Sequence, residues 1–430
     1  MYLEHTMIMD MLYVAGIEFS GIDGTFFKHV RFKKGVILLL VTRDGNNKLL
    51  VPAWVICLKE DSDNYLYMAH QAKKLTGLST YLDRHRHVLY SDRHKGIPAF
   101  EREFSCGYAN CMKHIIDNLR VHLKKIPKAA VGFHDDQVFR IQKCNTKQDF
   151  TKSLNSLRRG FPHAADYLDA LPHHSTYLYA MLDNGLTTHG HKTSNVAEIV
   201  NNVISDVRFE HPYIFNDFLV KWHGEKFGER QDLIKEIQRR EHLLTPYARR
   251  LLGKSEHKAR EENLSVFDQG CNNYLVTHHK TVLGQEKTEE RNMVNLMRKT
   301  CTCPFLGTHR IPCMHVIVVL DNLNLRSNPE KYQQFRRDWI APYFWSENYI
   351  AGYQIWITLL LYLCYTFDIL SLYFCCTFAI LSLYFCCTFD ILLLHICYTF
   401  SILVLNYRLR KYDSLSPGDG SPRGITFEGK

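Results

Sequence analysis

The sequence predicts an α/β fold in which strands come first and helices follow. Residues 13–60 contain apolar and β-branched runs that are typical of strands. From about residue 95 to residue 260, apolar residues recur three and four positions apart, as they do in amphipathic helices. This order favours a mixed sheet with helices on it and a helical insertion. A small cysteine-containing module and an apolar repeat tail complete the expected α/β architecture.

The first strands are predicted to form a hairpin. Tyr13–Asp23 and Val36–Thr42 are apolar segments, and the chain returns along Lys48–Leu58. Arg43–Asn47, with the sequence Arg-Asp-Gly-Asn-Asn, lies between the last two. An Asp-Gly pair between two apolar runs is a good short-range hairpin signal.

The next elements alternate between helix and strand. We expect a helix near Asn64–Lys74 and a short buried strand at His87–Asp92 that ends in a carboxylate. Longer helices are predicted where the helical spacing is clearest: Ala109–His122, Ala197–Val207 and Tyr213–Ile237.

Composition places only broad limits on function. With 430 residues the chain is long enough for two or three domains. Lysine and arginine exceed aspartate and glutamate by nine, and the whole excess lies in residues 1–350. Such a mild bias suits a polyanionic partner, but it is equally compatible with no such partner. The 14 cysteines do not form a secreted disulfide framework and no secretory signal opens the chain, so we expect a reducing compartment.

A cysteine motif near residue 300 has the spacing C-x-C, nine residues, C-x-H. Its members are Cys301, Cys303, Cys313 and His315. Three thiolates and one imidazole are the donors of tetrahedral structural zinc, and four ligands leave no open position for water. We therefore predict a Zn²⁺ site that stabilises a fold. Strands within 270–300 should precede it, and a short helix at His315–Leu323 should follow.

Three acidic residues stand out by their context. Asp23 ends or lies within the first strand, Asp92 ends the strand at 87–92, and Glu198 opens a helix. Carboxylates at the ends of neighbouring strands, joined by one from a helix, can converge on two Mg²⁺ ions. Such an ion pair stabilises the in-line displacement of a phosphodiester.

Each of these acids also has a structural interpretation. Asp23 could belong to an Asp-Gly turn, and Asp92 could cap a helix that begins after Arg93. Glu198 follows Asn195 by three residues, which is the spacing of a capping box. The adjacent pair Asp135–Asp136 is a competing acidic site, although no predicted strand precedes it.

A further pair, Cys111 and His114, has C-x-x-H spacing on a predicted helix, so both side chains lie on one face. Two ligands do not make a zinc site, and a half-buried cysteine beside a packed histidine is an alternative.

The segment 364–407 consists of four near-identical copies with a period of eleven residues. Within it, Ile369–Phe389 is a stretch of 21 residues without a charge, long enough to span a membrane. Basic residues follow at 408–411, as they often do beside a membrane span. The copies also have the form of a translated tandem DNA repeat, which would make the tail a gene-model artefact. A thin repeat fold is the third alternative.

Taken in order, the motifs resemble one family. They are a D-G-T-F strand, an R-D-G-N-N hairpin, S-D-R-x-K-G, G-Y-x-x-C-x-x-H-x-x-x-N-L, T-S-N-x-A-E-x-x-N and C-x-C…C-x-H. This combination resembles a Mutator-like element (MULE) transposase with a SWIM-type zinc finger, over about residues 14–350. The resemblance implies a ribonuclease H-like catalytic domain with a helical insertion at 14–205, a helical region at 206–265 and a SWIM finger at 270–325. The apolar repeats at 355–407 lie beyond it.

The resemblance also implies roles for the candidate residues. Asp23, Asp92 and Glu198 match the catalytic acids that bind Mg²⁺, and Cys111 and His114 match a C-x-x-H between the second and third acids. The four residues of the cysteine motif match the zinc ligands. The implied activity is metal-dependent cleavage and transfer of DNA strands, with double-stranded transposon ends as substrate, association between copies of the chain, and a nuclear location.

Two departures keep other functions open. The segment Leu186–His191 lacks the aromatic and arginine signature that the family carries near the third acid, and the repeat at 364–407 is foreign to it. A catalytically inactive or domesticated zinc-binding protein that contacts DNA or protein is the alternative. A membrane-associated protein held by the repeat is a further one.

Overall fold

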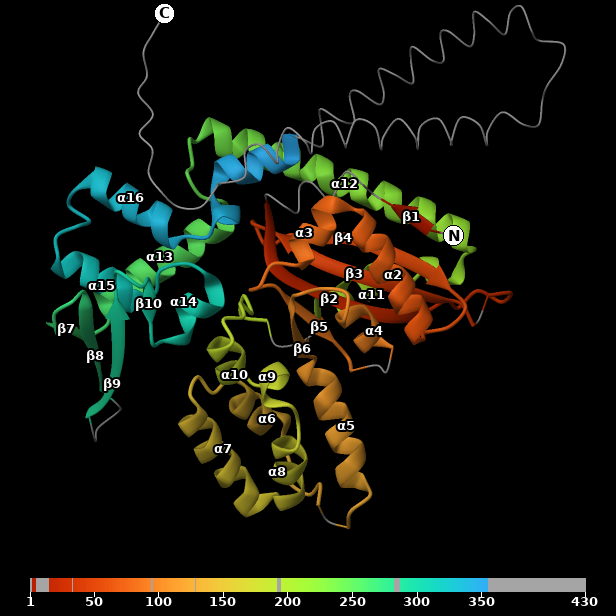
Figure 1. Ribbon diagram of the computed structural model, residues 1–430, viewed down its shortest axis with the longest axis horizontal. Coiled ribbons are helices and arrows are strands. Elements are labelled where there is room, and N and C mark those ends of the chain that lie inside the picture. The colour runs from red at the N-terminus through yellow and green to blue at the C-terminus, as the bar shows by residue number, and fades with distance from the viewer. Residues whose placement is uncertain are drawn as a thin grey trace, which may run out of the picture. The chain divides into compact units, whose positions relative to one another are not determined.

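A six-stranded mixed sheet forms the N-terminal part of the described chain (Figure 1). Its strands are β1 (Tyr2–Glu4), β2 (Gly16–Phe26), β3 (Val36–Asp44), β4 (Leu49–Cys57), β5 (Val88–Ser91) and β6 (Gly107–Asn110). They lie in the order β1-β4-β3-β2-β5-β6. Neighbours among β2, β3 and β4 are antiparallel, whereas β5 runs parallel to β2 and β6 parallel to β5. The strands expected at 13–60 and 87–92 are confirmed, while β1 and β6 were not predicted.

The computed structural model describes most of the chain before the repeat. The described residues are 2–4, 15–32, 34–93, 96–127, 129–191, 195–281 and 287–354. The chain divides into two units, Met1–Leu359 and Leu360–Lys430. The predicted repeat at 364–407, with its candidate membrane span, lies outside the described residues. Among the helices that are described, none is both long and apolar enough to cross a bilayer.

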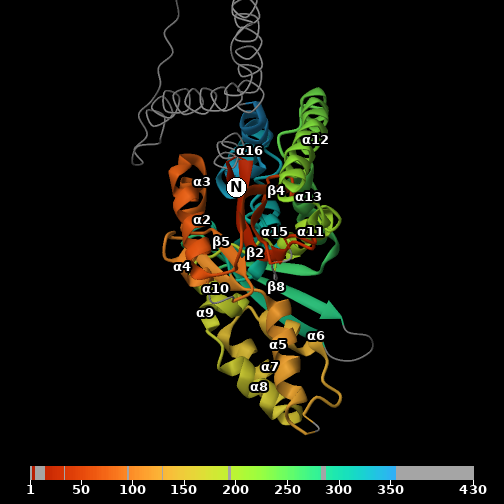
Figure 2. The ribbon, with the colours of Figure 1, turned by 90° about the vertical axis from the view of Figure 1, so that its right-hand side faces the viewer.

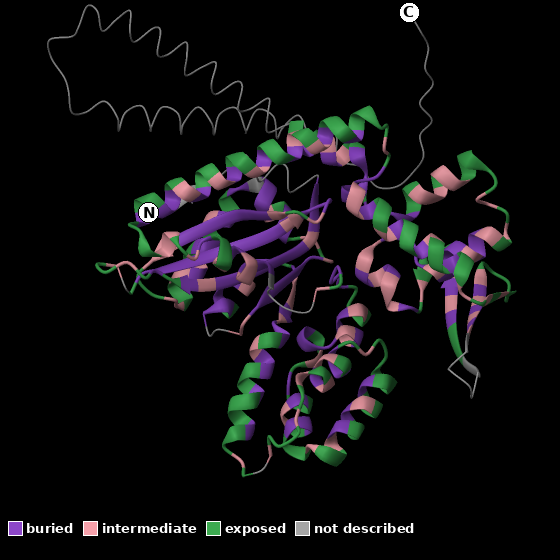
Figure 3. Ribbon diagram, turned by 180° about the vertical axis from the view of Figure 1, so that it is seen from behind, coloured by how far each residue is buried: buried purple, intermediate pink, exposed green. Residues whose placement is uncertain are grey.

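Strand β3 is buried on both sides of the sheet (Figure 3). Its side chains alternate between two hydrophobic cores, with Ile37, Leu39 and Val41 in one. The other core receives Val36, Leu38 and Leu40. A strand covered on both faces is apolar at consecutive positions, which explains the unbroken apolar run in the sequence.

Helices cover both faces of the sheet (Figure 2). One face carries α2 (Ser62–Lys74), α3 (Thr76–Leu82) and α4 (Ile97–Glu101), and the other carries α11 (Asn195–Val203) and α12 (Pro212–Arg239). Helix α2 begins where the side chain of Asp61 accepts a hydrogen bond from the backbone N–H of Asn64 at 3.1 Å, an N-cap. The helices predicted at 64–74, 197–207 and 213–237 are confirmed.

The chain between β6 and α11 is a helical insertion with its own core. It consists of α5 (Met112–Lys124), α6 (Asp135–Gln142), α7 (Lys147–Gly160), α8 (Pro162–Asp169), α9 (His173–Thr176) and α10 (Leu178–Asp183). Helix α9 contacts β6, so the insertion packs directly beside the sheet. The predicted insertion is confirmed.

A smaller sheet follows the long helices. The 3₁₀ turn η1 (Val207–Phe209) precedes α12, and α13 (Pro246–Glu261) leads into β7 (Leu264–Asp268), β8 (Asn273–Thr281), β9 (Lys287–Asn295) and β10 (Thr300–Cys301). These strands form an antiparallel sheet of order β10-β9-β8-β7. The chain continues through α14 (Pro304–His309), α15 (Met314–Asn322), α16 (Pro329–Trp339) and the turn η2 (Pro342–Phe344). The strands expected within 270–300 and the helix at 315–323 are confirmed, while β7 was not predicted.

The turn between β3 and β4 confirms the predicted hairpin. The side chain of Asp44 accepts hydrogen bonds from the backbone N–H groups of Asn46 at 3.0 Å and Lys48 at 2.8 Å. Gly45 is required because a Cβ there would lie 1.9 Å from the carbonyl oxygen of Tyr343. The hairpin turn is therefore packed against the end of the described chain.

The same Asp44 carboxylate joins three distant segments. Its Oδ2 accepts hydrogen bonds from Arg230 Nε at 3.2 Å, from the Tyr349 hydroxyl at 3.0 Å and from the Tyr353 hydroxyl at 2.7 Å. The side chains of Asp44 and Arg230 are 0% and 4% exposed. A buried charge is tolerated when it is paired and hydrogen-bonded, and this one is both.

Replacing Arg230 with methionine should lower the free energy of unfolding by about 3–5 kcal/mol, because it leaves the Asp44 charge buried without its counter-ion. Chemical denaturation of the full chain measures the loss. Lys235→Met on the same helix is the control: its pair with Asp232 is exposed, so the change should stay below about 1 kcal/mol. Equal losses in the two variants would contradict the role given to Asp44.

Candidate functional site

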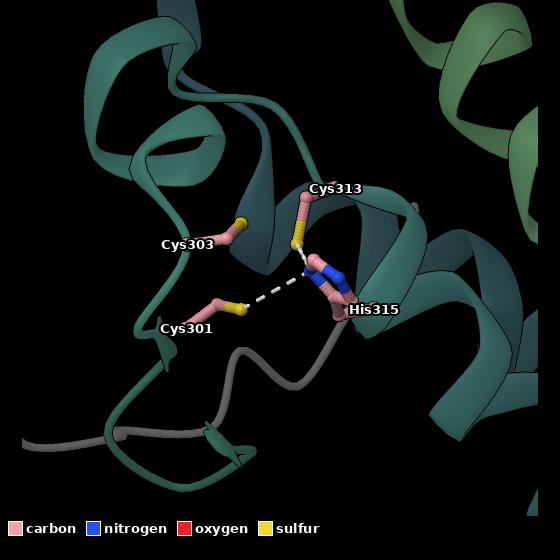
Figure 4. Close-up of side chains that lie close together, drawn as sticks. All are labelled: Cys301, Cys303, Cys313 and His315. Atoms are coloured by element: carbon pink, nitrogen blue, oxygen red, sulfur yellow. Dashed lines mark hydrogen bonds between the residues drawn. The ribbon is translucent and has the colours of Figure 1, made fainter. Parts of the chain in front are cut away.

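Four side chains converge in the module that follows β9 (Figure 4). One donor atom from each lies within 4.8 Å of the others, and the residues are Cys301, Cys303, Cys313 and His315. The Nδ1 atom of His315 lies 3.8 Å from the sulfurs of Cys301 and Cys313. Three of the four residues are buried, and Cys301 is half-buried. The structure thus brings the predicted zinc ligands together.

Turns at helix ends position these ligands. Cys301 lies in β10, which pairs with β9, and Cys303 is the N-cap residue of α14. Arg310 closes α14 in the left-handed conformation with φ of 57°, which turns the chain back toward the first two cysteines. Cys313 is then the N-cap residue of α15, and His315 lies in its first turn.

The donor chemistry fits zinc. Hydrogen bonds from the thiols of Cys301 and Cys313 lower the pKa of Cys303 well below its ordinary value, so a thiolate is stabilised within the cluster. The hydrogen bond to Cys303 raises the pKa of Cys301 to about 12. Zn²⁺ binds thiolates and neutral imidazole, and this closed set of four suits a structural ion.

An asparagine lies against the ring nitrogen of His315 that does not face the cysteines. Asn292, which is 6% exposed on β9, places its side-chain amide 3.3 Å from Nε2 of His315. The atom that faces Nε2 is the side-chain nitrogen Nδ2 of Asn292, and Oδ1 of Asn292 accepts a hydrogen bond from the hydroxyl of Thr302 at 3.3 Å. Asn292 therefore connects the histidine to the segment that carries the first two cysteines. No sequence pattern pointed to this residue, because it lies outside the ligand spacing.

Comparison with known proteins agrees with this geometry. A model of the SWIM zinc finger matches residues 282–324, which contain all four ligands. A search for similar curated proteins gave no match. The chain is therefore a zinc-binding protein with a SWIM zinc finger.

Asp23 and Asp92 lie on neighbouring parallel strands. Asp23 is within β2 and 8% exposed, so the Asp-Gly turn considered for it is wrong. Asp92 directly follows β5. It does not cap the next helix, because α4 begins after Gly96 and has no side-chain cap.

Charge crowding is strong around Asp23. Burial raises the pKa of Asp23 to about 7, and the negative charges of Asp92 and Glu60 raise it too, while the positive charge of His114 opposes them. The amide of Asn201 on α11 donates a hydrogen bond to Oδ2 of Asp23 at 3.0 Å. Asn201 was missed as a functional residue, although it follows Glu198 by three residues on the same helix face.

Glu198 lies in the first turn of α11, which packs on β2. Its Oε2 accepts a hydrogen bond from Lys113 at 2.8 Å, and its Oε1 has no hydrogen-bond partner within the described chain. Residues 192–194, which precede α11, lie outside the described residues, so the capping-box interpretation of Glu198 is not tested. Lys113, the missed partner, lies inside the C-x-x-H motif.

The second close group of donors in the described chain contains Cys111, His114 and Glu198, again with one atom from each within 4.8 Å of the others. Asp23 and Asp92 are not part of a group as close as this one. The competing pair Asp135–Asp136 lies at the start of α6, where Asp135 pairs with an arginine. The catalytic role of Asp23, Asp92 and Glu198 stays a prediction.

The segment 186–191 has a structural role between the two sheets. On the zinc-finger side, the backbone N–H of His189 donates to the carbonyl of Thr308 at 2.8 Å. Thr308 and His309 belong to α14, which lies between the second and third zinc ligands. At Gly190, a Cβ would approach His309 Cε1 to 2.9 Å, so the two segments touch.

On the other side, the same segment contacts the strands that carry the acids. The hydroxyl of Tyr90 on β5 donates to the carbonyl of His191 at 2.9 Å. The ring of His191 stacks on Phe19 of β2 with centroids 4.0 Å apart. The segment 186–191 therefore links the zinc finger to both acid-bearing strands.

Replacing Cys313 with serine should remove one equivalent of bound zinc per chain, because a buried thiolate is lost from a closed set. Elemental analysis of the purified protein measures the metal. Cys271→Ser is the matched control, since that thiol is exposed and lies outside both donor groups, and it should leave the zinc content unchanged. Full zinc retention in Cys313→Ser would rule out this ligand set.

Replacing Gly190 with alanine should destabilise the protein more than the same change at Gly185. Both have positive φ, 76° and 71°, so each substitution has a similar backbone cost of about 1 kcal/mol. Only the Gly190 methyl meets His309, which packs on Phe305, and this adds about 1–2 kcal/mol. Denaturation of both variants measures the difference. Equal losses would show that segment 186–191 does not pack tightly on α14.

Proposed function

We propose that this chain is a MULE-type transposase, a metal-dependent enzyme that cleaves and transfers DNA strands with a ribonuclease H-like core. The observation that carries the proposal is the placement of three acids. Asp23 lies on β2, Asp92 follows the neighbouring parallel strand β5, and Glu198 lies on α11, which packs on β2. A helical insertion separates the second acid from the third, as the family resemblance implies. The SWIM zinc finger is in keeping with such a protein.

Asp23, Asp92 and Glu198 would bind Mg²⁺ in this enzyme. Burial and the charge of Asp92 raise the pKa of Asp23 to about 7, so a cation beside these two carboxylates would relieve their repulsion. When bound, Mg²⁺ stabilises the attacking and leaving oxygens of an in-line phosphodiester displacement. The amide of Asn201 orients the Asp23 carboxylate through its hydrogen bond.

The proposed substrate is the double-stranded end of a transposon. A pocket is lined by Ser91 and Arg93, the chain neighbours of Asp92, and by Asn110 of β6, but none of the three acids lines it. Arg93 adopts a backbone φ of 70°, which is a strained conformation for a residue other than glycine. The net charge of +9 is compatible with a polyanionic partner. A nuclear location and association of several chains on DNA belong to the same proposal.

One observation favours a second candidate, an inactive relative that binds DNA or protein through its zinc finger. Glu198 is paired with Lys113 at 2.8 Å and belongs to a donor group with Cys111 and His114. A third acid held in this way would leave Asp23 and Asp92 as an incomplete set. The zinc finger would then carry the function.

Replacing Asp92 with asparagine should lower Mg²⁺-dependent cleavage of terminal-repeat DNA by about 10³-fold, the scale of losing one group that stabilises transition-state charge. A nicking assay with purified full-length protein measures the rate. Asp136→Asn is the control, because Asp136 is exposed on α6, and it should keep the original rate. An active wild-type enzyme whose rate survives Asp92→Asn would refute this assignment. No cleavage by the wild-type protein would favour the binding protein.

A further inference from the structure

A group of three donors lies where the helical insertion meets α11. The Cys111 sulfur, a ring nitrogen of His114 and a carboxylate oxygen of Glu198 lie within 4.8 Å of one another. We propose that these side chains bind a divalent transition-metal ion of the Zn²⁺ type, in addition to the zinc in the SWIM finger. The sequence pattern alone provides only two of the three ligands, and the fold supplies the third from 84 positions beyond His114.

The backbone presents the first two donors in a fixed arrangement. Cys111 connects β6 to α5, and its backbone N–H donates to the carbonyl of Ser91 at 2.7 Å. It occupies the N-cap position of α5, but its side chain caps no backbone group. His114 follows by three residues, so its ring lies on the same helix face. Both donors therefore point toward the first turn of α11, where Glu198 lies.

Two polar atoms of the group are buried without hydrogen bonds in the described structure. They are Nδ1 of His114 and Oε1 of Glu198. A buried polar atom without a partner is destabilising by about 1–3 kcal/mol, and unsatisfied atoms in native proteins often mark an ion or a water. Two such atoms in one donor group indicate a ligand that both can bind.

The donor types decide the class of ion. Thiolate and imidazole are ligands of Zn²⁺ and related transition metals, whereas Mg²⁺ requires oxygen donors in octahedral geometry. A thiolate, an imidazole and a carboxylate make a three-ligand zinc site, which keeps its fourth position open to water. This distinguishes the proposed site from the closed Cys₃His set of the finger.

Lys113 competes with the ion. Its ammonium group lies 2.8 Å from Oε2 of Glu198, and its side chain is 56% exposed. The positive charge repels a cation at the neighbouring donors, yet it engages only one carboxylate oxygen. The other oxygen is available to the ion.

The proposed site does not depend on DNA cleavage, because neither Asp23 nor Asp92 is a ligand in it. Two metal equivalents in a protein without nuclease activity would reject the transposase proposal and keep this site. Conversely, Mg²⁺-dependent cleavage by a chain that binds a single transition-metal ion would support the transposase proposal and contradict the second metal site.

Titration of the metal-stripped, reduced full-length protein with Co²⁺ tests the proposal, because thiolate-to-cobalt absorption reports each site. The wild-type chain should bind two equivalents, and His114→Ala should bind one. His122→Ala is the matched control on the same helix: this residue is exposed and lies outside both donor groups, so two equivalents should remain. Cys313→Ser should lose the equivalent bound by the SWIM finger and retain the equivalent bound by Cys111, His114 and Glu198.

A second variant keeps the test decisive if His114→Ala fails to fold. Lys113→Met changes an exposed side chain and removes the competing charge, so the second equivalent should bind about tenfold more tightly. One equivalent in the wild-type protein, two in a folded His114→Ala, or unchanged affinity in Lys113→Met would each overturn the proposal.

Discussion

The buried carboxylate of Asp44 joins the β3–β4 turn of the six-stranded sheet to helix α12 and to the end of the described chain. It is 0% exposed, and its two oxygens accept hydrogen bonds from a hairpin turn, from α12 and from two tyrosines at 349 and 353. In a medium of low polarity such a charge is stable only when every one of these donors is in place. Segments more than 300 positions apart are therefore fixed to one turn of the sheet. The adjacent strand β2, which carries Asp23, is positioned on this frame.

Segment 186–191 joins the zinc finger to the six-stranded sheet. That segment contacts α14 on one side and the residues Tyr90 and Phe19 of the acid-bearing strands on the other. Two histidines of this segment have packing roles: the backbone N–H of His189 donates a hydrogen bond to α14, and the ring of His191 stacks on Phe19 of β2.

Local patterns in the sequence were sufficient to predict many of the strands and helices and the zinc site. Unbroken apolar runs predicted β3 and β4, an Asp-Gly pair predicted their turn, and ligand spacing predicted the zinc site, since each signal lies within a few adjacent residues. The short strand β6 was missed because four residues of mixed polarity carry no periodic signal. The bonds of Asp44 to Arg230 and of Glu198 to Lys113 were missed for a different reason: they join residues that only the tertiary fold brings together.

The electrostatics around Glu198 explain how one residue can serve either proposed function. Asp23, Asp92 and Glu198 place negative charge near His114, and the positive charge of His114 lowers the pKa of Asp23. Lys113 supplies one further positive charge from a largely exposed position. At equal distance a divalent ion gains about twice the Coulomb energy of an ammonium group. A metal at the other carboxylate oxygen is therefore a stronger counter-ion than Lys113. The side chain of Lys113 is 56% exposed and can move into water, whereas Cys111 is buried and His114 half-buried.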